Sequence, residues 1–155
     1  SVAAARRSID GPLLLAIAAA FGLGAALETS GVAAAIGGGL LTLAGSDLWL
    51  LLVCTYLATT LLTEVVTNNA TAVLMFPIVM AATEAAGANP VPFTIAIMMA
   101  ASASFATPIG YQTNLMVYGP GGYRFSDFLR FGLPLNVLCG VVTVLVAPLV
   151  WPLQG

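Results

Sequence analysis

Charged residues are so sparse in this chain that most of its length is suited to the interior of a lipid bilayer. Four arginines and six acidic residues make up 6% of the chain, whereas soluble domains carry about 25% charged residues. Roughly 17–25 apolar residues span a bilayer as a helix, so the sequence predicts an all-α integral membrane protein with several crossings. The uncharged stretches are 11–27, 29–46, 48–63, 65–83, 85–123 and 131–155.

Several classes of function are excluded by the residues that the chain lacks or keeps apart. No run of basic residues is present, so we predict no nucleic-acid partner. The chain has no histidine, and Cys54 and Cys139 stand alone in apolar segments, which excludes zinc and iron–sulfur sites. The sequence shows no catalytic triad, Cys–His pair or phosphate-binding loop, so we expect neither an enzyme nor an organic cofactor.

Two groups of polar residues, glycine and proline interrupt the apolar sequence. The first break is Thr67–Thr71, and the second is Thr107–Asn114. Such residues are costly in a bilayer unless they line a cavity or bind a solute. A single break indicates a helix kink more often than a site. Two breaks that each combine threonine with asparagine favour a site where helices stop at mid-depth and hold a solute.

The first break predicts a re-entrant helical hairpin over residues 63–85. Its expected arms, Leu57–Val66 and Ala70–Met80, hold about ten residues each and reach roughly 15 Å, which is half of the hydrocarbon core. At the tip, carbonyl groups that end one arm suit sodium, and free N–H groups that begin the other suit an anion. Glu64 and Glu84 flank the hairpin and are interpreted as interfacial; the alternative is a charge buried in the transport domain.

The second break predicts that a helix over 93–118 is interrupted near Thr107. Pro108 cannot donate a backbone hydrogen bond, and Gly110 permits unusual backbone angles. We expect the second half of the helix to begin at about Thr113, with its N-terminus directed at the hairpin tip. The two helix starts then converge on one anion.

The remaining segments are predicted to be mainly scaffold helices within 12–62 and a final helix over 126–152. Residues 32–44 contain three consecutive glycines and either span the membrane or lie at its surface. Arginines are enriched in cytoplasmic loops, and the two arginine pairs of this chain fall on one side only if 32–44 spans. We therefore expect five crossings and one hairpin that enters from the exterior face. The arginines are Arg6, Arg7, Arg124 and Arg130.

Both breaks resemble signatures of a known transporter family. Residues 62–71 read Leu-Thr-Glu-Val-Val-Thr-Asn-Asn-Ala-Thr, and residues 106–114 read Ala-Thr-Pro-Ile-Gly-Tyr-Gln-Thr-Asn. They resemble the two motifs of the divalent anion:sodium symporter family, within the ion transporter superfamily. The resemblance covers residues 12–152. Asn69 departs from the threonine that is usual in the family.

The resemblance implies an elevator-type transporter built from two inverted repeats, of which residues 1–155 look like the C-terminal one. The implied partners are the N-terminal repeat, a second copy in a homodimer, the lipid bilayer and a small anionic substrate. The implied location is the bacterial inner membrane. For the coupling sodium ion we expect contacts at Thr67, Asn68, Thr107, Pro108 and Gly110. For the substrate we expect contacts at Asn68, Asn69, Thr71, Thr107, Thr113 and Asn114.

Taken with the resemblance, the residues predict sodium-coupled symport of a small divalent anion, either sulfate or a dicarboxylate. The alternative is a channel, or a membrane anchor of a sensory protein, without coupled transport. A channel requires a continuous polar pore, whereas this chain has two local breaks between apolar arms. A simple anchor does not require the second break.

Overall fold

The computed structural model of the protein is built from helices in the part of the chain that it describes. That part comprises residues 29–154 and, before them, residues 15, 18–19, 22–23 and 25–27. The expected first helix within 12–27 lies largely outside the described residues, as do Arg6 and Arg7. The helices are α3 (Val32–Ala44), α4 (Leu48–Thr63), α5 (Asn68–Ala86), α6 (Pro90–Ser102), α7 (Gln112–Tyr118) and α8 (Phe125–Val150).

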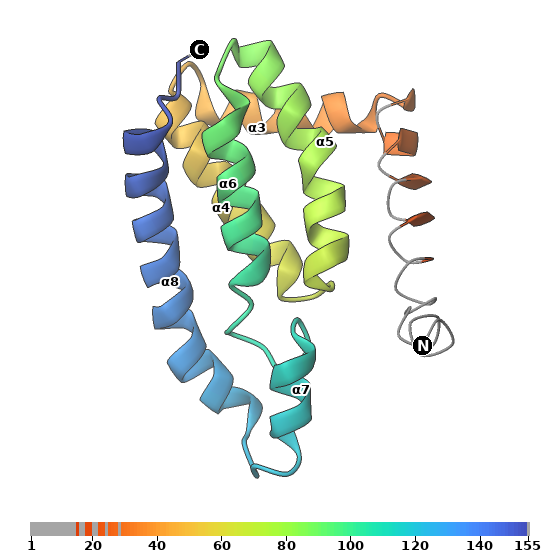
Figure 1. Cartoon of the computed structure of the whole chain (residues 1–155), viewed down its shortest axis with the longest axis vertical. Coiled ribbons are helices and arrows are strands. Elements are labelled where there is room, and N and C mark those ends of the chain that lie inside the picture. The colour runs from red at the N-terminus through yellow and green to blue at the C-terminus, as the bar shows by residue number, and fades with distance from the viewer. Residues whose placement is uncertain (1–14, 16–17, 20–21, 24, 28, 155) are drawn as a thin grey trace, which may run out of the picture.

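The body of the molecule is a bundle of α4, α5, α6 and α8 (Figure 1). α4 and α6 run in one direction, and α5 and α8 run in the opposite direction. Leu52, Phe93 and Ala96 are fully buried in the core between these helices. In a bilayer, close packing replaces the hydrophobic effect as the force that holds helices together, and small side chains such as alanine permit it.

α3 lies across the upper end of this bundle in Figure 1 instead of running alongside it. Its 13 residues make roughly 20 Å of helix, which is shorter than the hydrocarbon core. Direction and length therefore favour the surface alternative for 32–44 over the crossing that we expected, while the number of crossings stays a prediction. Within the described residues, α5 and α8 are the helices long and apolar enough to cross a membrane.

α4 and α5 form an antiparallel pair joined by the turn 64–67. The expected arms of about ten residues were too short, because α4 has 16 residues and α5 has 19. The side chain of Asn136 on α8 contacts Glu64 in this turn. Asn136 lies about 11 residues, or roughly 17 Å, from the start of α8, whose whole length is roughly 39 Å. The tip of the pair therefore lies near the middle of the longest helix.

The second break separates α6 from α7. The chain is non-helical from Ala103 to Tyr111, and α7 begins at Gln112. The break expected near Thr107 falls inside this interval, and the second helix begins one residue before the expected Thr113. The final helix, expected over 126–152, runs from Phe125 to Val150.

The end of the bundle that is uppermost in Figure 1 is closed by the residues that follow α8. Asn89, in the turn between α5 and α6, donates from its backbone nitrogen to the Leu153 carbonyl at 2.9 Å. Its Nδ2 donates to the Pro152 carbonyl at 2.9 Å, and its Oδ1 accepts from the Val91 nitrogen at 3.1 Å. One side chain thus caps α6 and holds the C-terminal segment against the α5–α6 turn.

The contact between α3 and α5 generates a testable prediction. A Cβ atom on Gly37 would lie 2.8 Å from the Ile78 carbonyl oxygen and 3.2 Å from the Ala82 nitrogen, so the two helix backbones leave no room for a methyl group. We expect Gly37→Ala to lower the midpoint of thermal unfolding in detergent, since overpacking costs about 1–3 kcal/mol.

The matched control is Gly38→Ala, because a Cβ atom on the neighbouring Gly38 meets nothing within 4 Å. This change should leave the midpoint unchanged or raise it, since alanine is the better helix former by about 1 kcal/mol. Equal midpoints for the two variants would contradict the close approach of α3 and α5.

Candidate functional site

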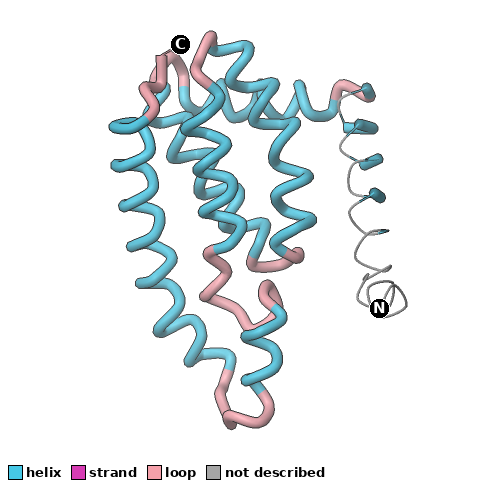
Figure 2. Tube along the Cα trace, in the orientation of Figure 1, coloured by secondary structure: helices cyan, strands magenta, loops and turns pink. Residues whose placement is uncertain are grey.

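The turn that ends α4 and the non-helical segment 103–111 lie against each other (Figure 2). A helix leaves its last carbonyl groups without partners in the helix. Ser104 Oγ donates to the Thr63 carbonyl at 3.2 Å, and Thr107 Oγ1 donates to the Glu64 carbonyl at 2.8 Å. Hydroxyl groups of the second break therefore satisfy the carbonyl groups that α4 leaves free at the first.

The end of α6 meets the end of α4 at the same place. Thr63 Oγ1 donates to the Ala101 carbonyl at 2.9 Å. Because α4 and α6 are parallel, the negative ends of both helix dipoles and the terminal carbonyl groups of both helices face one region. Such a convergence favours a cation.

The Asn68 carboxamide lies at the centre of this region. The side-chain amide atom that faces the helix ends is 3.0 Å from Thr63 Oγ1, 3.1 Å from the Ala101 carbonyl oxygen and 3.2 Å from the Gly110 carbonyl oxygen. The amide nitrogen occupies this position, since it donates to all three oxygens there, whereas the amide oxygen would face carbonyl acceptors. The carbonyl and hydroxyl oxygens gathered around the amide are the kind of ligand that a hard cation such as sodium takes.

Glu64 supplies the site with a carboxylate. Its Oε1 accepts from Asn136 Nδ2 at 2.7 Å and from the Ala106 backbone nitrogen at 3.1 Å. Its Oε2 lies 3.5 Å from Ser104 Oγ. Glu64 is half-buried and bonded within the chain, which favours the alternative of a charge inside the domain over the interfacial interpretation. No arginine within the described part of the chain forms an ion pair with this carboxylate.

Gly110 and Pro108 are both buried in the second break. A Cβ atom on Gly110 would overlap Ser104 Oγ and the Thr63 carbonyl oxygen, so only glycine lets this segment approach the end of α4 so closely. The Gly110 nitrogen donates to Thr107 Oγ1 at 3.2 Å. Pro108 has no N–H group that would need a partner here.

The predicted substrate residues divide into two groups. Asn114 belongs to the packed site, because its Nδ2 donates to the Ser104 carbonyl at 2.9 Å and to the Thr107 carbonyl at 3.1 Å. Thr71 is fully buried, and its Oγ1 has no hydrogen-bond partner among the described residues. Asn69 and Thr113 are exposed on the surface of this chain.

The exposed Thr67 is the N-cap of α5, with its Oγ1 3.4 Å from the Ala70 nitrogen. The structure therefore brings Asn68, Thr107, Gly110 and Asn114 together, and it does not bring Asn69 or Thr113 into the same cluster. The sequence prediction missed Thr63, Glu64, Ser104 and Asn136 as members of this cluster. Glu64 alone carried a signal, since it is a charge beside a polar break in apolar sequence.

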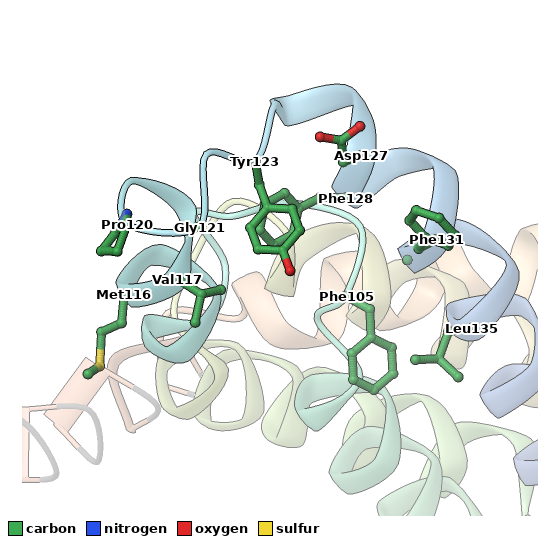
Figure 3. A pocket seen from close by; sticks show the side chains of 11 residues that line it. Phe105, Met116, Val117, Pro120, Gly121, Tyr123, Asp127, Phe128, Phe131 and Leu135 are labelled. Carbon is green, nitrogen blue, oxygen red and sulfur yellow. The ribbon is translucent and has the colours of Figure 1, made fainter.

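A separate pocket of about 650 Å³ opens between α7 and the first half of α8 (Figure 3). Its walls are mostly aromatic and aliphatic, and its one acidic side chain, Asp127, accepts from the Arg124 backbone nitrogen at 2.7 Å. An apolar pocket with an acidic group suits no anion. The lining residues are Phe105, Met116, Val117, Pro120, Gly121, Tyr123, Asp127, Phe128, Phe131, Gly132 and Leu135.

Comparison with known proteins gives one family and several relatives. Residues 1–153 match the profile of the CitMHS family, described as citrate transporter. An uncharacterized transporter of Synechocystis sp. is 50% identical over 134 residues, which are 85% of this chain and 22% of that protein. Sodium/sulfate cotransporter 2 of Chlamydomonas reinhardtii is 41% identical over 141 residues, which are 89% of this chain and 16% of that protein.

A mammalian protein is similar as well. Solute carrier family 13 member 1 of Rattus norvegicus is 30% identical over 139 residues, which are 90% of this chain and 23% of that protein. The chain thus spans less than a quarter of the length of each of these three relatives.

The tight contact at Gly110 generates the prediction of this section. We expect Gly110→Ala to lower the thermal unfolding midpoint, since its Cβ atom displaces the second break from the end of α4 at a cost of about 1–3 kcal/mol. Gly119→Ala is the control, because a Cβ atom there meets nothing within 4 Å. If Gly110→Ala were as stable as Gly119→Ala, the two breaks would not be in the contact described above.

Proposed function

Because this chain belongs to the CitMHS citrate transporter family, related to the divalent anion:sodium symporters, we propose that it forms part of a sodium-coupled symporter for sulfate or a dicarboxylate. The family match confirms the resemblance that the two motifs indicated. The proposal of sodium as the coupling ion and sulfate as a substrate is supported by the names of two similar proteins of Chlamydomonas reinhardtii, sodium/sulfate cotransporters 1 and 2.

The observation that carries the proposal is the meeting of two helix C-termini with the Asn68 carboxamide. We propose that sodium binds there to Thr63 and the carbonyl groups of Ala101 and Gly110, and that the Asn68 carboxamide turns to present its oxygen to the ion. Thr107 then acts by holding the end of α4, through its hydrogen bond of 2.8 Å to the Glu64 carbonyl. Of the expected sodium contacts, Pro108 shapes the turn and Thr67 begins α5.

The anion is proposed to bind at the start of α5, next to the sodium ion. The N–H groups of the first helical turn have no partners in the helix, and the positive end of the dipole lies there. Asn69 and Thr113 are exposed and available for such a ligand. Without sodium, the Glu64 carboxylate and the carbonyl groups of two helix ends would repel an anion at short range. Sodium binding removes that repulsion, which couples the two solutes.

Several features of the whole protein are part of the proposal. The α4–α5 pair is re-entrant, the chain is the C-terminal one of two inverted repeats, and the second repeat supplies the other half of the anion site. The protein is multi-pass in a bacterial inner membrane and works as a homodimeric elevator. The channel alternative is disfavoured because the polar groups of the two breaks bind one another and do not line a continuous path.

Asn68 provides the test of the sodium site. Asn68→Ala removes an oxygen ligand, so we expect sodium-dependent uptake of labelled sulfate or succinate into vesicles to fall at least about tenfold while expression is kept. The control is Thr94→Val, because Thr94 Oγ1 bonds only within its own helix, to the Pro90 carbonyl at 3.0 Å. Uptake by Asn68→Ala with unchanged rate and sodium dependence would refute the assignment.

The re-entrant arrangement predicts an accessibility pattern. In a protein with Cys54 and Cys139 replaced by alanine, Val66→Cys marks the tip of the α4–α5 pair and Glu84→Cys marks its open end. We expect a membrane-impermeant thiol reagent to label Glu84→Cys from one side of the membrane and not to label Val66→Cys from the opposite side, because a re-entrant chain turns back at 64–67 before it reaches that side. Labelling from opposite sides would show that one of the two helices crosses completely.

A further inference from the structure

One contact of the site reaches a helix that neither motif contains. Asn136 on α8 is 6% exposed, and its Nδ2 donates to Glu64 Oε1 at 2.7 Å. The neighbouring Leu135 and Val137 are exposed on the surface of this chain. A buried amide in an apolar helix is costly unless it is bonded, and its Oδ1 has no partner among the described residues. Burying the Asn136 amide therefore costs folding free energy, and the contact with Glu64 is the interaction gained in return.

The accepting oxygen of Glu64 is shared between two donors. Oε1 also accepts from the Ala106 backbone nitrogen at 3.1 Å. Asn136 therefore fixes one atom that in turn fixes the segment 103–111. The residue after Ala106 is Thr107, whose hydroxyl holds the Glu64 carbonyl at 2.8 Å. A closed loop of contacts thus sets the distance between the end of α4 and the second break.

The same loop determines where oxygen atoms are presented to a cation. The carbonyl group of Gly110 belongs to the second break, whereas Thr63 belongs to α4, and both face the Asn68 carboxamide. If the Glu64 side chain turned away, the break would be held to α4 by hydroxyl groups alone. The Gly110 carbonyl would then no longer be fixed relative to Thr63 and Asn68.

We propose that Asn136 is a positioning residue for sodium binding that acts through Glu64 and does not contact the ion. The inference rests on the proposed function, since it assigns α8 a part in the same sodium site. Asn136 orients the Glu64 carboxylate, and the carboxylate aligns the two breaks. Changes at Asn136 therefore alter the affinity for sodium more than the affinity for the anion.

The test compares side-chain changes in the intact protein reconstituted into lipid vesicles. Asn136→Leu removes the donor at similar volume, and we expect the sodium concentration for half-maximal sulfate uptake to rise at least about tenfold. The KM for sulfate at saturating sodium should stay unchanged. Thr143→Val is the control, because Thr143 is similarly buried on α8 about two turns further along and should leave both values unchanged.

A double-mutant cycle separates this role from general packing. In a protein that already carries Glu64→Ala, Asn136→Leu should have no further effect on the sodium dependence, because the pair acts as a unit. Glu64→Gln keeps an oxygen acceptor at the Oε1 position, so Asn136→Leu should still weaken sodium binding in that background. Additive effects of Asn136→Leu and Glu64→Ala, or unchanged sodium dependence in Asn136→Leu alone, would overturn the proposal.

A second variant keeps the test decisive if Asn136→Leu does not fold. Asn136→Asp sets two carboxylates against each other, which should weaken sodium binding more than Glu64→Gln does. Adding Glu64→Gln to Asn136→Asp should recover part of the loss, and the absence of any recovery would count against the pair. If the unaltered protein shows no sodium-dependent uptake at all, the proposed function itself fails, and this inference fails with it.

Discussion

A helix that ends in an apolar interior must find partners for its last carbonyl groups, and the arrangement of this chain follows from that requirement. α4 and α6 both end at the level where Glu64 meets Asn136, well inside the length of α8. Side chains are the partners in the described part of the chain. Ser104 and Thr107 bind the carbonyl groups of α4, while Thr63 binds one of α6. The two breaks therefore satisfy each other's backbone groups.

The meeting of these helix ends also concentrates negative electrostatic potential in one region. Carbonyl groups of two parallel helices and the Glu64 carboxylate lie beside the start of α5, whose dipole has the opposite sign. In the proposed transporter, this adjacency is the physical basis of coupling, because a cation must settle at one side before an anion is favourable at the other. Coupling then requires only short-range electrostatics in a medium of low dielectric constant.

The sequence was informative wherever local chemistry decides the outcome. Pro108, Gly110 and the polar residues near Asn68 were sufficient to predict two interruptions, and the start of α7 fell within one residue of the prediction. The arms around the first break were underestimated because apolar runs alone do not show where a neighbouring helix begins. α3 was expected to cross because a crossing places both arginine pairs on one side, but its length and its packing against α5 decide its direction.

The contacts of Glu64 could not be predicted from the residues near it in the sequence. A lone carboxylate in apolar sequence is normally placed at an interface, and its best partner lies 72 residues away on another helix. The role of Ser104 could not be predicted from the sequence either, since a serine in an apolar helix usually bonds its own backbone. Long-range partners of this kind follow from the fold and not from spacing along the chain.

The late position of Asn136 and of the C-terminal segment has a consequence for how the protein is made. The carbonyl groups at the end of α4 have no side-chain partners until Ser104 and Thr107 have been synthesised. Asn89 likewise has no partner at Pro152 until 63 further residues have been synthesised. The turn of the hairpin is consequently synthesised well before Asn136, which completes its contacts. During membrane insertion, the polar tip must therefore be kept away from lipid by the insertion machinery or by helices that are already inserted.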